Sequence, residues 1–159
     1  MKKNPYDFFI NLCKKEFSFL VKMYECKIMP NKTADQEDVI VYKNTTTGVT
    51  IRLDPGEGGV LVNLYKLINN KIPSYSLDNG YILEDVIFIQ TSDSSIYSKN
   101  SGMAITEDTL PIITKKYAAL LAQYASDILR GDFKIFPNIK MLVNKRRDEY
   151  NNKLGKIGK

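Results

Sequence analysis

The chain has 159 residues, of which 43% are hydrophobic and 26% charged, a balance typical of folded globular proteins that argues against intrinsic disorder. This length suits a single domain spanning residues 1–159 with a substantial buried core. The net charge of +5 invites a nucleic-acid hypothesis, but charge alone reports on solubility and non-specific attraction. No apolar run approaches the roughly 20 residues that a membrane helix needs.

The first residues do not have the pattern of a secretion signal, because Asp7, Asn11 and Lys14 interrupt the apolar run. Two cysteines, Cys13 and Cys26, are too few for a disulfide framework. We therefore expect reduced thiols and a cytoplasmic protein.

The first predicted element is a helix that begins at Pro5, with Asn4 as its N-cap. Apolar residues then recur at steps of three and four, which is typical of a helix packed on a core. This stripe consists of Phe9, Cys13, Phe17, Leu20 and Tyr24. The polar segment 30–38 follows and predicts a loop.

Three strands come next, joined by short turns. Residues 39–42 are rich in β-branched side chains, and residues 49–54 and 60–65 alternate between apolar and polar positions, the period of a half-buried strand. The turns are residues 44–48 and 54–59. The second turn is rich in glycine, but no Lys-Ser/Thr pair follows it and the next element is a strand, so we interpret it as a turn and not as a phosphate-binding loop.

Residues 76–90 fit two interpretations. Ser76 or Asp78 would suit the cap of a short helix, whereas the apolar run YILEDVIFI would also suit a strand, and the sequence leaves both open. The stretch 91–102 is rich in Ser, Asp and Asn and predicts a mobile loop, which we interpret as an insertion.

The last third is predicted to be helical. Thr106 suits an N-cap, Pro111 suits a first turn, Gly131 marks a helix end, and Asp132 suits the turn that follows. The buried stripe of this helix is predicted to contain Leu110, Ile113, Tyr117, Leu120, Leu121, Tyr124 and Ile128.

A final helix is predicted to open at Pro137 and to end in a frayed basic tail near 153–159. Its apolar side is predicted to carry Ile139, Leu142, Val143, Tyr150 and Leu154. The complete pattern predicts an α+β fold, with an N-terminal helix, a three- to four-stranded antiparallel meander and a C-terminal helical pair packed on the sheet.

The sequence offers little for catalysis. Histidine, the usual general base at neutral pH and the commonest metal ligand, does not occur, and no pattern indicates a cofactor or a metal. The neighbouring carboxylates include three pairs that we considered for acid–base chemistry, and we expect them to be solvated at the surface instead. These pairs are Glu37/Asp38, Asp54/Glu57 and Glu84/Asp85. The sequence therefore favours a protein that is not an enzyme.

Four segments carry a resemblance that covers most of the chain: residues 16–24 (EFSFLVKMY), 39–54 (VIVYKNTTTGVTIRLD), 75–86 (YSLDNGYILEDV) and 120–136 (LLAQYASDILRGDFKIF). Their order resembles small bacterial cytoplasmic proteins encoded beside polymorphic or contact-dependent toxins as immunity proteins. The resemblance implies a non-catalytic protein that binds a cognate toxin domain and occludes it. Immunity proteins of basic nucleases tend to be acidic, so a basic chain implies a different kind of toxin or a local acidic patch.

Under this interpretation the partner is a toxin domain, and the chain is a monomer or a weak homodimer without cofactor, metal or membrane contact. The expected contact residues lie on the meander, its turns and the preceding loop: Arg52, Asp54, Glu57, Asn63, Tyr65, Asp35, Glu37 and Asp38. Two other classes stay open, a nucleic-acid-binding module that uses the basic C-terminal helix and a homo-oligomeric adaptor that buries one wet face of the meander against a copy of itself. We regard nucleic acid as the weaker hypothesis, because a basic final helix more often forms a solvated face.

Overall fold

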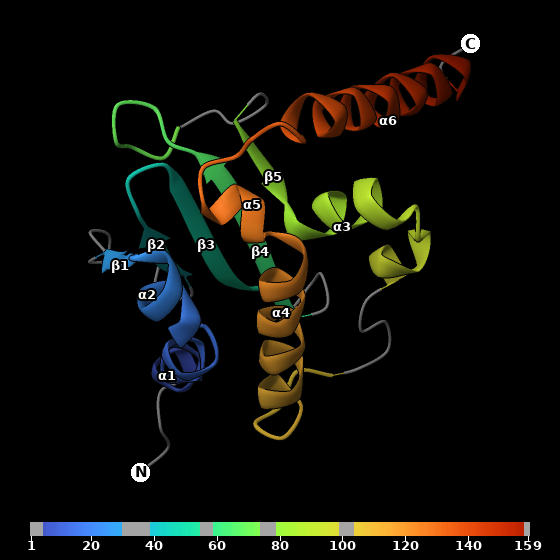
Figure 1. Ribbon diagram of the computed structural model, residues 1–159. Coiled ribbons are helices and arrows are strands. Elements are labelled where there is room, and N and C mark those ends of the chain that lie inside the picture. The colour runs from blue at the N-terminus through green and yellow to red at the C-terminus, as the bar shows by residue number, and fades with distance from the viewer. Residues whose placement is uncertain (1–4, 30–38, 55–58, 74–78, 99–103, 158–159) are drawn as a thin grey trace.

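The structure is a computed structural model that describes residues 5–29, 39–54, 59–73, 79–98 and 104–157. It is an α+β protein in which helices pack against one antiparallel sheet (Figure 1), and this confirms the predicted fold class. The helices are α1 (Pro5–Glu16), α2 (Ser18–Tyr24), α3 (Leu83–Thr91), the 3-10 helix η2 (Ser94–Ser98), α4 (Leu110–Tyr124), α5 (Ser126–Leu129) and α6 (Phe136–Ile157). The strands are β1 (Lys27–Met29), β2 (Val39–Lys43), β3 (Thr47–Asp54), β4 (Gly59–Lys66) and β5 (Gly80–Ile82).

The sheet is a five-stranded antiparallel meander in which each strand pairs with the next along the chain. The sequence predicts three or four strands. The two edge strands, β1 and β5, have three residues each, and so short a strand shows too little alternation to be recognised. The two longest strands, β3 and β4, pair over their whole length, with Ile51 opposite Val62.

One face of the sheet forms the core. Val49, Ile51, Val62 and Leu64 point to this face and are buried, because alternate residues of a strand point to the same side. The first helix and the long helix of the last third, α1 and α4, cover this face. Their core residues include Phe9, Cys13, Ile113, Tyr117 and Leu121.

The predicted N-terminal helix is divided into two. Phe17 interrupts it with a non-helical backbone conformation, and its ring is completely buried at the junction of α1 and α2. Pro5 opens α1 as expected. Asn4 and the predicted loop 30–38 lie outside the described residues.

Both elements that the sequence left open for residues 76–90 occur in the described part of this range, whereas the predicted caps Ser76 and Asp78 lie outside the described residues. β5 ends at Ile82, whose extended backbone leads directly into α3. Residues 94–98 of the stretch predicted as a mobile loop form η2, and Tyr97 of η2 packs its ring against Phe88 of α3 with centroids 5.6 Å apart. Residues 99–102 of that stretch lie outside the described part of the chain.

The helical last third agrees with the sequence in its turn residues and differs in its helix bounds. The Thr106 hydroxyl accepts a hydrogen bond from the Thr109 amide, as a capping residue does, although α4 begins only at Leu110. Gly131 follows α5 with a positive φ of 90°. A side chain there would meet Thr46 at 3.0 Å, so both conformation and space favour glycine.

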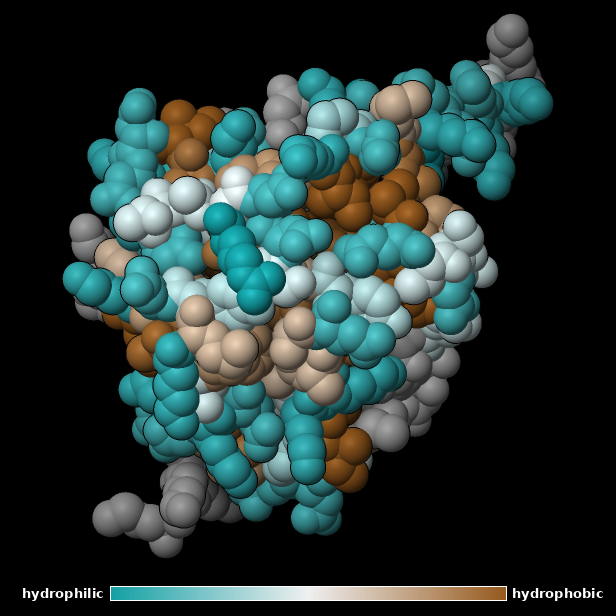
Figure 2. Space-filling model, viewed as in Figure 1, coloured by the Kyte–Doolittle hydropathy of each residue, from teal (hydrophilic) through white to brown (hydrophobic). Residues whose placement is uncertain are grey.

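The final helix, α6, packs on the body only with its first half. Ile139 is buried and Val143 is half-buried, whereas residues 145–156 are all exposed. Figure 2 shows hydrophobic side chains gathered beneath the first half of α6 and mostly hydrophilic ones along the second half. Helix continues to Ile157, so residues 153–157 of the tail predicted to fray are helical.

Candidate interaction face

Four of the eight predicted contact residues are described, and they lie on the face of the sheet opposite the core. Arg52 and Asp54 of β3 alternate with the core residue Ile51, and Asn63 and Tyr65 of β4 do the same. The other four lie outside the described residues: Asp35, Glu37, Asp38 and Glu57. The alternation of two neighbouring strands therefore brings together the residues that sequence reasoning chose separately.

The strand register sets the neighbours on this face. Arg52 stands opposite Leu61, and Asn63 stands opposite Thr50, which makes Arg52 and Asn63 diagonal neighbours on adjacent strands. Arg52 is exposed and the other residues are half-buried. We name as the outer sheet face the residues Val41, Thr50, Arg52, Asp54, Leu61, Asn63 and Tyr65.

One end of the outer sheet face is covered by the chain that follows β4. Gly48 lies opposite Tyr65, and the Ile72 side chain approaches it so closely that a Cβ on residue 48 would lie 2.8 Å away. The Lys43 ammonium donates a hydrogen bond to the Asn70 carbonyl at 2.8 Å and holds the same segment. The accessible part of the face therefore centres on Arg52.

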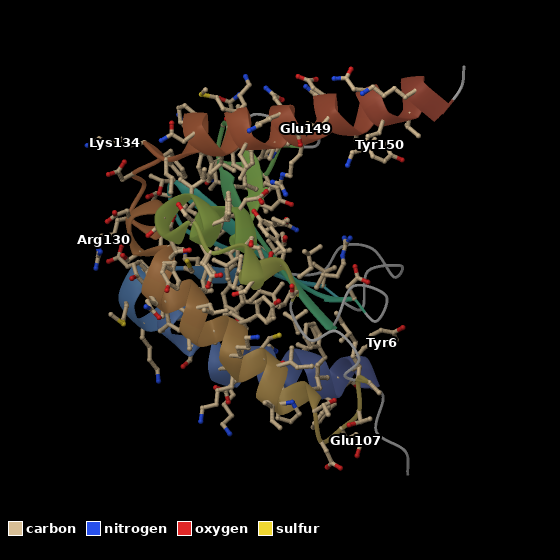
Figure 3. The ribbon with its side chains drawn as sticks, turned by 90° about the vertical axis from the view of Figure 1, so that its right-hand side faces the viewer. Tyr6, Glu107, Arg130, Lys134, Glu149 and Tyr150 are labelled. Atoms are coloured by element: carbon tan, nitrogen blue, oxygen red, sulfur yellow. The ribbon has the colours of Figure 1, made fainter. Side chains whose placement is uncertain are left out.

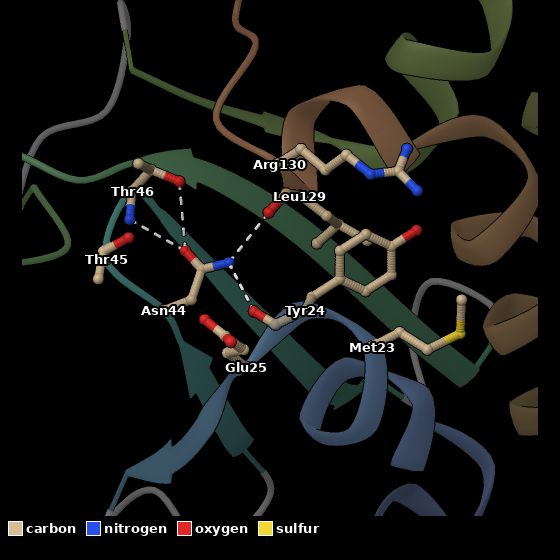
Figure 4. A pocket seen from close by; sticks show the side chains of 8 residues that line it. All are labelled: Met23, Tyr24, Glu25, Asn44, Thr45, Thr46, Leu129 and Arg130. Carbon is tan, nitrogen blue, oxygen red and sulfur yellow. Dashed lines mark hydrogen bonds between the residues drawn. The ribbon is translucent and has the colours of Figure 1, made fainter.

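A hollow of about 300 Å³ lies elsewhere, between α2, α5 and the β2–β3 turn (Figure 4). Its floor is the Asn44 amide, which donates to the carbonyls of Tyr24 at 3.1 Å and Leu129 at 2.9 Å. The Asn44 side-chain oxygen accepts from the amides of Thr46 at 3.0 Å and Thr47 at 2.8 Å. All of these polar contacts are internal to the fold, so we assign the hollow a structural role.

The pair Glu84/Asp85 was expected at the surface, and this expectation is wrong. Glu84 is completely buried and Asp85 is 4% exposed. Both lie in the first turn of α3, where the helix dipole favours negative charge. The apolar run around them, YILEDVIFI, was the signal for their burial, because Leu83, Val86 and Ile87 beside them are also buried and leave this turn no exposed side.

Both buried carboxylates have partners from other elements. Asp85 accepts hydrogen bonds at 2.6 Å from the Tyr97 hydroxyl and at 2.6 Å from the Arg146 guanidinium. Burial and the negative charge of the neighbouring Glu84 carboxylate raise the pKa of the Tyr117 hydroxyl of α4 well above its usual range. Burial and the bond to Asp85 raise the pKa of Tyr97 in the same direction. The cluster therefore joins α3, η2, α4 and α6.

The thiols are unsuited to nucleophilic attack. Cys13 and Cys26 are buried and free, as the sequence predicts for reduced thiols. Burial raises the pKa of Cys26 to about 11 and that of Cys13 further, so both stay protonated at neutral pH. Within the described residues, no group of His, Cys, Asp and Glu side chains could hold a metal ion.

Comparisons of the chain with protein-family models, with curated proteins and with solved structures find no match. Among the described helices, none has the length and hydropathy required to cross a membrane.

Proposed function

We propose that this protein is a non-catalytic immunity protein, which binds a cognate bacterial toxin domain in the cytoplasm and occludes it. The observation that carries the proposal is the outer sheet face, where arginine, tyrosine, amide and hydroxyl groups lie on one side of two paired strands. Arginine and tyrosine are the residue types that most often dominate protein–protein affinity. The resemblance to immunity proteins supplies the identity of the partner.

The support under this face favours binding without rearrangement. Val49, Ile51, Val62 and Leu64 anchor the reverse side of β3 and β4 in the core, so the outward side chains stand on a rigid surface. Pre-organised surfaces of this kind move little on binding and lose little conformational entropy. A stable complex would bury roughly 1,600 Å² in total.

The test is a protection assay joined to a binding measurement. The C-terminal domain of the immediately upstream open reading frame is expressed with and without this protein, growth is followed, and the Kd of the purified pair is measured. We expect this protein to relieve the growth defect and Arg52→Glu to raise the Kd about tenfold or more, as for a central arginine. The control, Lys116→Glu, makes the same charge change on an exposed residue of α4 and should bind normally.

Each possible result of these experiments tests a different part of the proposal. Protection without a stable complex would contradict occlusion, and growth inhibition that this protein does not relieve would remove the immunity assignment. A complex that Arg52→Glu leaves unchanged would move the interface away from the outer sheet face.

A further inference from the structure

The second half of α6 stands clear of the rest of the molecule. Along one side of the helix, Ile139 is 0% exposed, Val143 is half-buried, Tyr150 is 63% exposed and Leu154 is 49% exposed. In Figure 3 this half extends past the sheet, and Tyr150 lies on the opposite side of the molecule from Arg130 of the segment after α5. The helix therefore continues for about three turns beyond its last buried residues.

The side that α6 turns to the body continues along its projecting half. Ile139, Val143, Arg146, Tyr150 and Leu154 follow one another at steps of four, three, four and four residues, which places them on one face of a helix. The first three contact the body, through the core and through Asp85. Tyr150 and Leu154 extend the same apolar stripe where the described body no longer covers it.

Intrinsic propensity supports the last turns of this helix only weakly. Asn151, Asn152 and Gly155 are poor helix formers, so residues 151–155 contribute little helical stability of their own. An amphipathic helix of this length gains most of its stability when its apolar face packs against a surface.

The projecting half is also basic. Residues 145–156 include five basic side chains and two acidic ones, a net charge of +3. Arg146 is engaged by Asp85 and stacks over Tyr97, whereas Lys145, Lys153 and Lys156 are exposed. A surface complementary to this half is therefore apolar along its centre and acidic along its edges.

We propose that residues 145–156 form a docking helix, which inserts Tyr150 and Leu154 into an apolar groove bordered by carboxylates on the partner protein. The inference rests on the proposed function, since the partner is the same toxin domain. It assigns a contact on α6 to the complex besides the outer sheet face, and an acidic contact surface to the toxin. An acidic toxin surface is complementary to the positive net charge of this chain, whereas a basic nuclease would require an acidic inhibitor.

Two other occupants fit the helix less well. A second copy of this chain would bring two helices of net charge +3 together. A nucleic acid would use the basic residues and not the apolar stripe, and Asp148 and Glu149 interrupt the basic residues at the middle of the projecting half. A protein groove uses both the stripe and the charge.

The experiment measures the Kd of the full-length protein for the toxin domain with two double variants of α6. Tyr150→Ala/Leu154→Ala removes the stripe and keeps the helix, because alanine is a strong helix former. Lys145→Glu/Lys153→Glu reverses the charge. Matched controls are Met141→Ala, exposed on the other side of α6, and Lys115→Glu/Lys116→Glu, the same charge change on α4. Circular dichroism checks the fold of every variant.

We expect each α6 variant to raise the Kd at least tenfold, the controls to bind within about twofold, and added salt to weaken the wild-type complex. If the complex forms and the α6 variants bind normally, the docking helix is wrong and the proposed function stands. If no complex forms, both fail. Sedimentation of the protein alone tests for a dimer, and titration with duplex DNA tests for a nucleic-acid complex. Either species would also overturn the proposal if the α6 variants dissociate it.

Discussion

At the scale of single residues, Asn44 joins three parts of the chain that are distant in sequence. Its amide donates to the carbonyls of Tyr24 and Leu129, which end α2 and α5, while its oxygen closes the turn into β3. The Thr47 hydroxyl adds a bond to the Ile128 carbonyl at 2.7 Å. One partly buried side chain therefore fixes two helix ends against the sheet.

Replacing Asn44 should be costly for a polar residue near the surface. We expect Asn44→Ala to lower the free energy of unfolding by about 2–4 kcal/mol, since it leaves two carbonyls and two amides without their partner. Asn44→Asp should also destabilise, because it keeps the acceptor for the turn but directs a carboxylate at two carbonyl oxygens. Urea denaturation measures both, with exposed Thr45→Ala as the control. A loss below 1 kcal/mol for Asn44→Ala would show that water replaces these bonds.

The sequence predicted the turn at Asn44 but not its wider role. A turn is encoded locally by Asn, Thr and Gly, whereas the bond to Leu129 joins residues 85 apart. Local patterns contain no information on such a partner.

At the scale of elements, the contact of α6 with α3 depends on a buried charge. Asp85 is nearly inaccessible to solvent, whereas the Arg146 side chain is 43% exposed. The free-energy cost of losing the partner is therefore larger for the Asp85 carboxylate than for the Arg146 guanidinium. Without Arg146, a carboxylate stays buried with the Tyr97 hydroxyl as its remaining described hydrogen-bond donor. Without the charge of Asp85, the guanidinium can still reach water.

This asymmetry gives an order of stabilities. We expect Arg146→Met to lower the free energy of unfolding by about 3 kcal/mol, the range for a buried charge that loses its partner. Asp85→Asn should cost about 1–2 kcal/mol, because it keeps an oxygen for Tyr97 and leaves arginine partly solvated. The double variant should be more stable than Arg146→Met alone. Chemical denaturation of all three variants measures these free energies of unfolding. Equal losses of stability in the two single variants would contradict the asymmetry.

The sequence predicted helices and strands correctly where the periodic pattern of apolar residues was long. The alternation in β3 and β4 predicted both the strands and the outward position of Arg52 and Asn63, since a period of two is a local property. Residues 80–91 were ambiguous because a three-residue strand passes directly into a helix within one apolar run. Tyr150 and Leu154 lie on the predicted apolar side of α6 and are nevertheless exposed, because helical spacing identifies a face but not the end of the body that covers it.

At the scale of the whole molecule, the described body consists of a packed sheet-and-helix core and one arm. The core contains the inner face of the sheet, α1, α4 and the first half of α6, and it buries Cys13, Tyr117 and Ile139. The arm shares no buried residue with it, since every side chain from residue 145 to 156 is exposed. Stability is therefore assigned to the part of α6 that ends with the contact between Arg146 and Asp85, and partner binding to the exposed side chains around and beyond it.

Truncation of α6 separates these two properties. We expect removal of residues 150–159 to change the free energy of unfolding by no more than about 0.5 kcal/mol, as for other exposed positions, and to reduce the helical signal in circular dichroism. Removal from Ile139 onward should cost several kcal/mol, because it deletes a buried isoleucine and exposes the carboxylate of Asp85. Urea denaturation compares the two lengths with the full chain. A large loss of stability for the shorter deletion would show that the arm packs on the body in solution, and the arm could not then be free to dock.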